Sequence, residues 1–167
     1  SNIMLLSKSL TDPTQRKVIT WNNYSLDYDI NINSITQGKL TTKIEYKNLV
    51  SDTNYFYSSV KKESFPYMEV DYPSMFVVSK LSQSIPTTDG SYDKNIEQNF
   101  LYRGLTTHLQ GRGMIGFRQT ARSSWYATGF ENTKVWSGVE IDPLNEGIPI
   151  KEWSIKTNDI NQVFPSD

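Results

Sequence analysis

Apolar and polar residues alternate along much of this chain. In the clearest case, residues 40–47, one face holds Leu40, Thr42, Ile44 and Tyr46, and the other holds Thr41, Lys43, Glu45 and Lys47. Residues 24–32 follow the same period, with Leu26, Tyr28, Ile30 and Ile32 on one side. The turn-forming residues Thr36-Gln37-Gly38 separate the two segments. A period of two with one polar face predicts two strands joined as a hairpin.

Other short segments rich in β-branched and aromatic residues extend this pattern. We expect strands at residues 18–21, 55–57, 75–78, 100–104, 105–109, 135–141 and 148–155. Asp89-Gly90 marks a turn, and no segment combines an N-cap with a 3.6-residue apolar stripe. The chain is therefore predicted to be all-β, with about eight to ten short, mostly antiparallel strands in a sandwich or a curved open sheet, and little helix.

The domain organisation follows from length. With 167 residues the chain is predicted to form a single β-rich module, 1–167. Within it, residues 1–39 hold N-terminal strands, residues 40–150 the central segment, and residues 151–167 a last strand and tail. Ser1-Asn2 in place of an initiating methionine has the appearance of a cloning remnant. We therefore expect a fragment of a larger protein, with any export signal outside it.

Composition supports a sheet and narrows the function classes. Hydrophobic residues make up 37% of the chain and aromatic residues 13%, so aromatic side chains must supply much of the core. The net charge of −1 gives no overall field for nucleic acid or anionic lipid. The absence of cysteine excludes disulfides, thiolate catalysis and cysteine-bound zinc. No apolar run has the length of a membrane span.

Gly111, Gly113 and Gly116 spell the G-x-G-x-x-G fingerprint of dinucleotide-binding folds, and Glu131 follows at the expected spacing. The fingerprint works only between a buried parallel strand and a helix. The residues before the fingerprint are polar and do not form a buried strand. After it, Phe117, Ala121 and Trp125 have helical spacing, but the residues between them include poor helix formers. Glycines at a bulge or a close strand crossing are the favoured interpretation.

Four of the five arginines fall within twenty residues that contain no acidic residue: Arg103, Arg112, Arg118 and Arg122. Beside aromatic residues such a cluster is compatible with an anion or single-stranded nucleic-acid groove. Strand alternation, however, would divide the arginines between both faces of the sheet. We expect them instead to pair with carboxylates of this chain or of a larger parent protein.

Candidate catalytic and metal-binding residues are sparse. His108 is the only histidine, so a multi-histidine metal site is excluded. A Ser-His-Asp catalytic triad would have to use His108, and the sequence contains no G-x-S-x-G nucleophile elbow. Asp27, Asp29 and Asn31 alternate like calcium ligands but lack the glycine and distal glutamate of an EF-hand. A carboxylate pair for glycoside hydrolysis stays possible among Glu63, Glu69, Asp71, Glu131, Glu140 and Asp142.

Exposed tryptophans offer a second functional class. A carbohydrate- or surface-binding β-sandwich would use one or more of them as a stacking platform: Trp21, Trp125, Trp136 and Trp153. The same residues are equally expected in the core of a chain with few aliphatic residues.

Three segments, in order, resemble one protein family. Leu40–Asp52 is similar to a "T-x-I-x-Y-x-P-L-T-D" stretch, with Asn48 in place of the proline, and Tyr72–Ser79 is similar to "P-M-Y-V-V-S". Residues 100–104 and 109–118 resemble "Y-x-Y-x-G … L-Q-G-R-G-F-L-G-F-R". Together they resemble Rhs/YD-repeat proteins and the related Tc-toxin B subunits and SpvB-type proteins, in the segment between the FG-GAP/VCBS propeller and the YD repeats. Residues 123–136 depart from the shorter family version.

The resemblance implies a non-catalytic structural β-module of a large secreted bacterial shell protein that encloses or presents a toxic cargo. It implies no catalytic, cofactor-binding or metal-binding residue in this segment. Its partners would be neighbouring β-domains of the parent and the enclosed cargo, with no nucleic acid and no membrane span, and its location would be secreted or on the cell surface. An excised piece of such a shell is expected to self-associate through edges that the parent covers.

Overall fold

The computed structural model describes residues 4–8, 16–20, 31–38, 40–50, 61–71, 73–85 and 94–165, with only the backbone for 4–8, 16–20, Ile85 and Lys94. Two compact units are present, Ser1–Ile32 and Asn33–Asp167. The first contains an antiparallel pair, β1 (Met4–Lys8) and β2 (Arg16–Thr20). The expectation of one domain over residues 1–167 stays a prediction.

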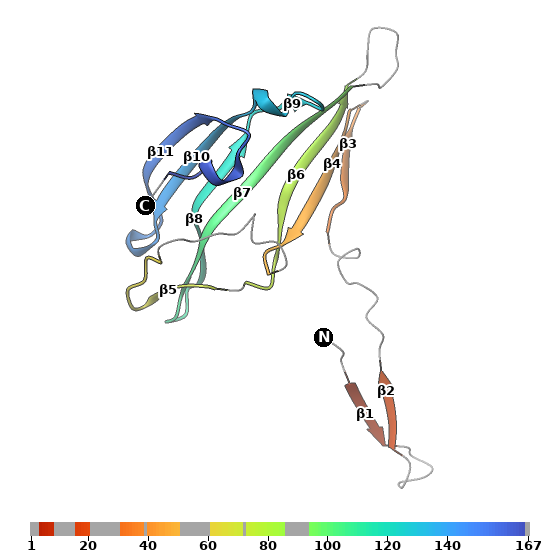
Figure 1. Ribbon diagram of the computed structural model, residues 1–167. Helices are drawn as coiled ribbons and strands as arrows, with labels where there is room; N and C mark the ends of the chain where they lie inside the picture. The colour runs from red at the N-terminus through yellow and green to blue at the C-terminus, as the bar shows by residue number, and fades with distance from the viewer. Residues whose placement is uncertain are drawn as a thin grey trace. The chain divides into compact units, whose positions relative to one another are not determined.

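The second unit is built on one antiparallel sheet of nine strands, which does not close on itself (Figure 1). Seven strands form its main path in the order β11-β10-β8-β7-β6-β4-β3. Their bounds are Ile148–Lys156, Val135–Asp142, Gly113–Ser123, Lys94–His108, Phe76–Ile85, Leu40–Asn48 and Ser34–Gln37, respectively. Three 3-10 turns are the helical elements of the described chain: η1 (Glu131–Thr133), η2 (Pro143–Asn145) and η3 (Ile160–Gln162).

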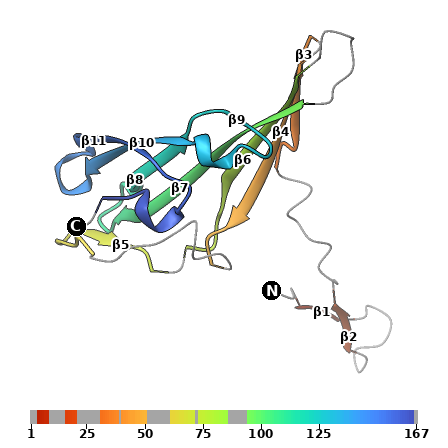
Figure 2. The same cartoon turned by 45° about the horizontal axis from the view of Figure 1, so that its top comes forward.

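Strand β7 is the centre of the sheet and is paired on both edges near its two ends, while its middle, residues 100–103, pairs with β8 alone among the described strands. Its first part pairs with β6 on one edge and with β9 (Tyr126–Ala127) on the other. Its last part pairs with β5 (Tyr67–Glu69) and β8 on opposite edges. Figure 2 shows β5 beside this end of β7. The short strands thus continue the sheet where β6 and β8 leave it.

Two small apolar clusters hold the sheet together. The first consists of Leu49, Val77 and Leu105, with Tyr102 and Phe117 packed against it. The second joins Leu101, Ala121 and Trp136 to Val163 of the C-terminal segment. That segment turns back from β11 and covers one face of β7, β8 and β10, where the indole of Trp153 donates a hydrogen bond to the carbonyl of Val163 (2.8 Å).

The all-β, antiparallel prediction is confirmed, and of the two architectures expected the open sheet is the one observed. The described residues contain eleven strands, slightly more than expected. The segments predicted at 40–47, 135–141 and 148–155 correspond to β4, β10 and β11. Within the described part of the chain, no helix has the length and apolarity that a membrane crossing requires.

Several local predictions were wrong. The strands expected at 100–104 and 105–109 are one strand, because Gly104 takes a left-handed φ of 66° inside β7 and kinks the strand without ending it. The helix that the spacing of Phe117, Ala121 and Trp125 left open, but that we did not favour, is absent: residues 113–123 form strand β8 and pair with β7 and β10. We expected β4 to form its hairpin with a strand at residues 24–32. Its hairpin partner is instead β3, which follows that segment.

Some predictions fall outside the described residues. These are the strand at 55–57, the turn at Asp89-Gly90, the candidate calcium ligands Asp27 and Asp29, and Trp21. Of the predicted strand 24–32, the structure describes Asn31 and Ile32, which lie outside any strand.

Candidate functional site

A cluster of charged side chains is buried where β5 meets the sheet. Its centre is Arg118 of β8, which is fully buried, while Glu69 of β5 and Glu140 of β10 are only 3% and 5% exposed. Arg118 Nε lies 3.7 Å from Glu69 Oε2, and Arg118 Nη1 lies 3.4 Å from Glu140 Oε1. Lys62 Nζ reaches the same Glu140 oxygen at 2.9 Å. We call these four residues the charge cluster.

A ladder of hydrogen bonds continues the cluster across the sheet. Arg103, Gln119 and Glu140 lie directly opposite one another on β7, β8 and β10. Arg103 Nη1 donates to Gln119 Oε1 at 3.1 Å, and Gln119 Nε2 donates to Glu140 Oε2 at 2.9 Å. Arg103 also lies over the ring of Phe164, 5.1 Å from its centre. The ladder thereby ties the charge cluster to the C-terminal segment.

Gly104 leaves the room that the cluster needs. A Cβ at this position would lie 3.0 Å from Arg118 Cβ and 3.2 Å from Glu69 Oε2. Both the left-handed backbone and this close approach favour glycine. The kink in β7 therefore lets Arg118 and Glu69 meet against the strand backbone.

The electrostatics of the cluster favour a charged Glu140. Burial opposes its ionised form, but hydrogen bonds from Lys62 and Gln119 and the charge of Arg118 outweigh burial, so the pKa of Glu140 lies below its ordinary value. Glu69 Oε1 accepts no hydrogen bond from any described residue. Glu69, Arg118 and Glu140 are closed to solvent, whereas the Lys62 side chain is 44% exposed. The charge cluster joins β5, β8 and β10 as an ionic clamp.

Three of the six carboxylates considered for hydrolysis lie at or beside the charge cluster: Glu69, Glu140 and Glu63, which accepts a hydrogen bond from the backbone amide of Glu69 (3.3 Å). Asp71 is exposed and pairs with Lys61. Glu131 and Asp142 lie elsewhere, where they accept hydrogen bonds from the amides of Gly129 and Leu144. Because Glu69 and Glu140 are both buried and share one arginine, they do not form an open acid/base pair. No group of metal-ligating side chains is found among the described residues.

The glycine fingerprint has a structural explanation. Gly111 and Gly113 lie in and just after the turn between β7 and β8, with φ of 101° and 72°. Gly116 lies opposite Thr106, where the pairing of β7 and β8 shifts register past Ile115. No helix follows these glycines, so the dinucleotide-binding geometry is absent from this hairpin, and the bulge is observed.

The four clustered arginines are divided over the sheet, as strand alternation predicts. Arg118 and Arg103 are buried in the clamp and the ladder. Arg112, in the β7–β8 turn, pairs with Glu146. Arg122 is exposed on the face opposite the C-terminal segment. They form no common anion groove.

His108 ends β7 and is not part of the charge cluster. Its ring packs edge-on against Tyr67, 4.9 Å between centres, and Nδ1 accepts a hydrogen bond from the amide of Gln110 (3.2 Å). This arrangement shapes the turn between β7 and β8.

The expectation of a tryptophan platform is wrong for two of the four tryptophans. Trp136 is only 2% exposed, and its indole donates to the carbonyl of Thr157 (3.1 Å). Trp153 packs beneath the C-terminal segment against Phe164. Trp125 is 39% exposed. Of the described tryptophans, Trp136 and Trp153 belong to the core because strand alternation directs them towards the covered face of the sheet.

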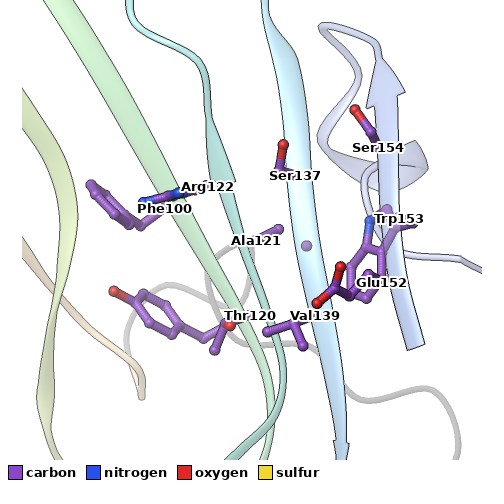
Figure 3. A pocket seen from close by; sticks show the side chains of 11 residues that line it. Phe100, Thr120, Ala121, Arg122, Ser137, Val139, Glu152, Trp153 and Ser154 are labelled. Carbon is purple, nitrogen blue, oxygen red and sulfur yellow. The ribbon is translucent and has the colours of Figure 1, made fainter. Parts of the chain in front are cut away.

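The other face of the same strands is hollow. A depression of about 840 Å³ lies over β7, β8, β10 and β11 (Figure 3). Strand register places its side chains in two rows across the four strands: Phe100, Arg122, Ser137 and Ser154 in one, and Tyr102, Thr120, Val139 and Glu152 in the other. We call this surface the hollow face.

Sequence reasoning missed the hollow face. Its residues come from four strands that are distant in the chain, and only strand order and register align them in rows. The sequence contained one signal for it. Thr120 and Arg122 alternate along β8 with Gln119, Ala121 and Ser123, which indicates that Thr120 and Arg122 lie on a different face of the sheet from the other three.

Comparisons of the chain with protein-family models, with curated proteins and with solved structures find no match.

Proposed function

We propose that this chain is a non-catalytic structural β-module of a larger secreted Rhs- or Tc-toxin-like shell protein, in which it helps to enclose or present a toxic cargo. The observation that carries the proposal is the open sheet. Among the described strands, the outermost ones, β11 and β3, each pair on one edge only. Unpaired strand edges of this length are normally covered by further structure.

The distribution of apolar side chains supports a module that packs against neighbours. The described part of the chain buries eight hydrophobic side chains, divided mainly between the two clusters. At one end of the sheet, four large apolar side chains face solvent: Phe65, Met68, Leu109 and Met114. We call them the loop-end patch.

The loop-end patch is held in place by backbone and strand contacts. The amide of Leu109 donates to the carbonyl of Pro66 at 2.8 Å, and both Met68 and Met114 lie opposite Thr107 of β7. Phe65 and Met114 are 75% and 58% exposed. A fixed apolar surface of this kind is typical of a contact between proteins or domains.

The segments that carry the family resemblance are also neighbours in space. Residues 40–52 contain β4, residues 72–79 lead into β6, and residues 100–118 form the β7–β8 hairpin. These four strands are consecutive in the sheet. Segments that are far apart in the chain therefore form one continuous structural unit, which is what a fold signature requires.

Hydrogen exchange on the full gene product tests the proposal. In a parent protein with flanking β-domains, the outer amides of β3 and β11 are expected to exchange much more slowly than in the isolated chain, because neighbouring strands cover them. Amides of β7 at residues 96–97 and 106–108, where both edges are paired within this chain, serve as the internal control. A gene product without flanking domains, or equal exchange in both forms, would contradict the proposal.

A further inference from the structure

The hollow face differs from its reverse side in being uncovered. The reverse side carries Leu101, Ala121 and Trp153, over which the C-terminal segment packs. On the hollow face a depression of about 840 Å³ is left open beside Phe100 and Tyr102, and Tyr102 also packs against the first apolar cluster. Neighbouring strands are about 4.8 Å apart and successive rows about 7 Å apart, so the hollow is long enough for an extended ligand across the strands.

Aromatic rings line one side of the hollow. Phe100 and Tyr102 follow each other on the same face of β7 and are partly exposed. The hydroxyl of Tyr102 donates to the carbonyl of Val78 at 2.8 Å, and burial raises the pKa of Tyr102 to about 12. Its hydroxyl is thus engaged and uncharged, and part of its ring packs against Phe117, 4.8 Å between ring centres, so only the remaining exposed part of the ring faces the hollow. Ring faces of this kind pack against the C–H groups of sugars.

Polar groups line the rest of the hollow. Arg122 and Glu152 are exposed, and within the described residues neither side chain has an ion pair or a hydrogen bond. Hydroxyl groups of Thr120, Ser137 and Ser154 lie in the same two rows. Charged donors and acceptors make stronger hydrogen bonds than neutral ones and match the paired hydroxyls of a sugar.

The charges of Arg122 and Glu152 indicate which kind of ligand the hollow face favours. One cation and one carboxylate leave no net charge, so the hollow gives no advantage to an anion or to a nucleic-acid backbone. An apolar protein surface would bury Arg122 and Glu152 without partners, which is costly. A neutral ligand rich in hydroxyls satisfies both charges and contacts both rings.

From this geometry we propose that the hollow face binds a neutral oligosaccharide, with Phe100 and Tyr102 as the stacking surface and Arg122 and Glu152 as the hydrogen-bonding residues. The ligand would lie across β7, β8, β10 and β11. This site does not depend on the proposed structural role, because the loop-end patch and the strand edges are separate surfaces.

Titration with defined oligosaccharides tests the inference. The whole chain is titrated by calorimetry and by two-dimensional NMR with cellotetraose, laminaritetraose, mannotetraose and N-acetylchitotetraose, and with tetragalacturonate as a charged comparison. We expect saturable binding of at least one neutral tetrasaccharide, with amide shifts concentrated at Thr120, Ser137 and Ser154. Tetragalacturonate should bind no more tightly than the best neutral ligand, because the charges of Arg122 and Glu152 cancel and give an anion no advantage.

Variants separate the site from unspecific binding. Arg122→Met and Glu152→Gln each remove one charge at an exposed position and should weaken binding at least about tenfold without lowering the melting temperature. Arg112→Met and Glu146→Gln change the same residue types at the β7–β8 turn and η2 and should leave binding unchanged. Absence of saturable binding by every neutral tetrasaccharide, or equal affinity in all four variants, would overturn the inference.

Discussion

Arg118 shows how a single residue can be required by several elements at once. It is fully buried and contacts carboxylates from β5 and β10. Burying an ion pair is costly, and removing one partner leaves an uncompensated charge in the interior. The cluster therefore acts less as a source of net stability than as a constraint on where the β5 segment lies.

Glu140 should make the stability of the fold sensitive to acid. Its folded-state pKa lies below the ordinary value, so its contribution is complete above about pH 4.5 and is lost as the pH falls through the lowered pKa. Glu140→Gln is expected to lower the free energy of unfolding by about 2–3 kcal/mol at pH 7. Urea unfolding of both proteins between about pH 7 and pH 3 measures this, and the difference should shrink on the acidic side. A difference independent of pH would contradict the assignment.

Gly104 should be far less replaceable than another glycine with the same backbone conformation. Gly104 and Gly38 have φ of 66° and 63°, but a Cβ on Gly38 meets no atom within 4 Å. Both alanine variants should lose about 1–2 kcal/mol through the left-handed backbone. Gly104→Ala should lose about 1–3 kcal/mol more, because it displaces Arg118 and Glu69. Denaturant unfolding compares the two, and equal losses would show that the close approach does not matter.

At the scale of elements, the two ends of the sheet are closed in different ways. The β5 segment is held by ions and by short backbone pairing with β7. The C-terminal segment is held by apolar contacts, by the Trp153 indole and by Arg103 over Phe164. The β5 segment is therefore attached mainly by ion pairs, and the C-terminal segment mainly by apolar packing.

Gly138 of β10 should be essential for the C-terminal cover. It lies opposite Trp153, and a Cβ on it would overlap the indole ring. Gly138→Ala should destabilise the protein by about 2–4 kcal/mol and shift tryptophan emission to longer wavelength, because the indole must leave its site. Ser137→Ala, the neighbouring position on the opposite face, should change stability by less than about 0.5 kcal/mol. Unfolding curves followed by fluorescence distinguish the two, and similar behaviour would contradict this packing.

At the scale of the whole molecule, the sheet has a protected centre and exposed margins. Strand β7 has neighbouring strands on both edges, whereas β3 and β11 end the sheet. The loop-end patch adds exposed apolar surface beside the β7–β8 turn. Such margins favour association with another β-structure.

The isolated chain should therefore self-associate through the loop-end patch. Analytical ultracentrifugation is expected to show a concentration-dependent dimer in the micromolar to millimolar range. Met114→Glu should abolish it by introducing charge into the patch, whereas Phe130→Glu, at a similarly exposed position next to η1, should not. A wild-type chain that stays monomeric up to about 1 mM would contradict the role of the patch.

The sequence by itself determined the secondary-structure class and several strand positions. The alternation of the two faces at residues 40–47 was sufficient to locate β4, because every second residue of a strand lies on the same face. It also indicated that the clustered arginines would be divided between faces. It failed at Gly104, because a glycine inside a strand and a glycine at its end look the same in sequence.

Only the tertiary structure decided which residues meet. Glu69, Arg118 and Glu140 are separated by 49 and 22 positions in the chain and are brought together by the order β5-β7-β8-β10. The rows of the hollow face likewise depend on the register of four strands, which non-local hydrogen bonds fix. Local propensity indicates which segments form strands, but the order and register of the strands arise from packing across the whole sheet. The hollow face, with Tyr102 and Glu152 in one row, is therefore recognisable only in the folded molecule.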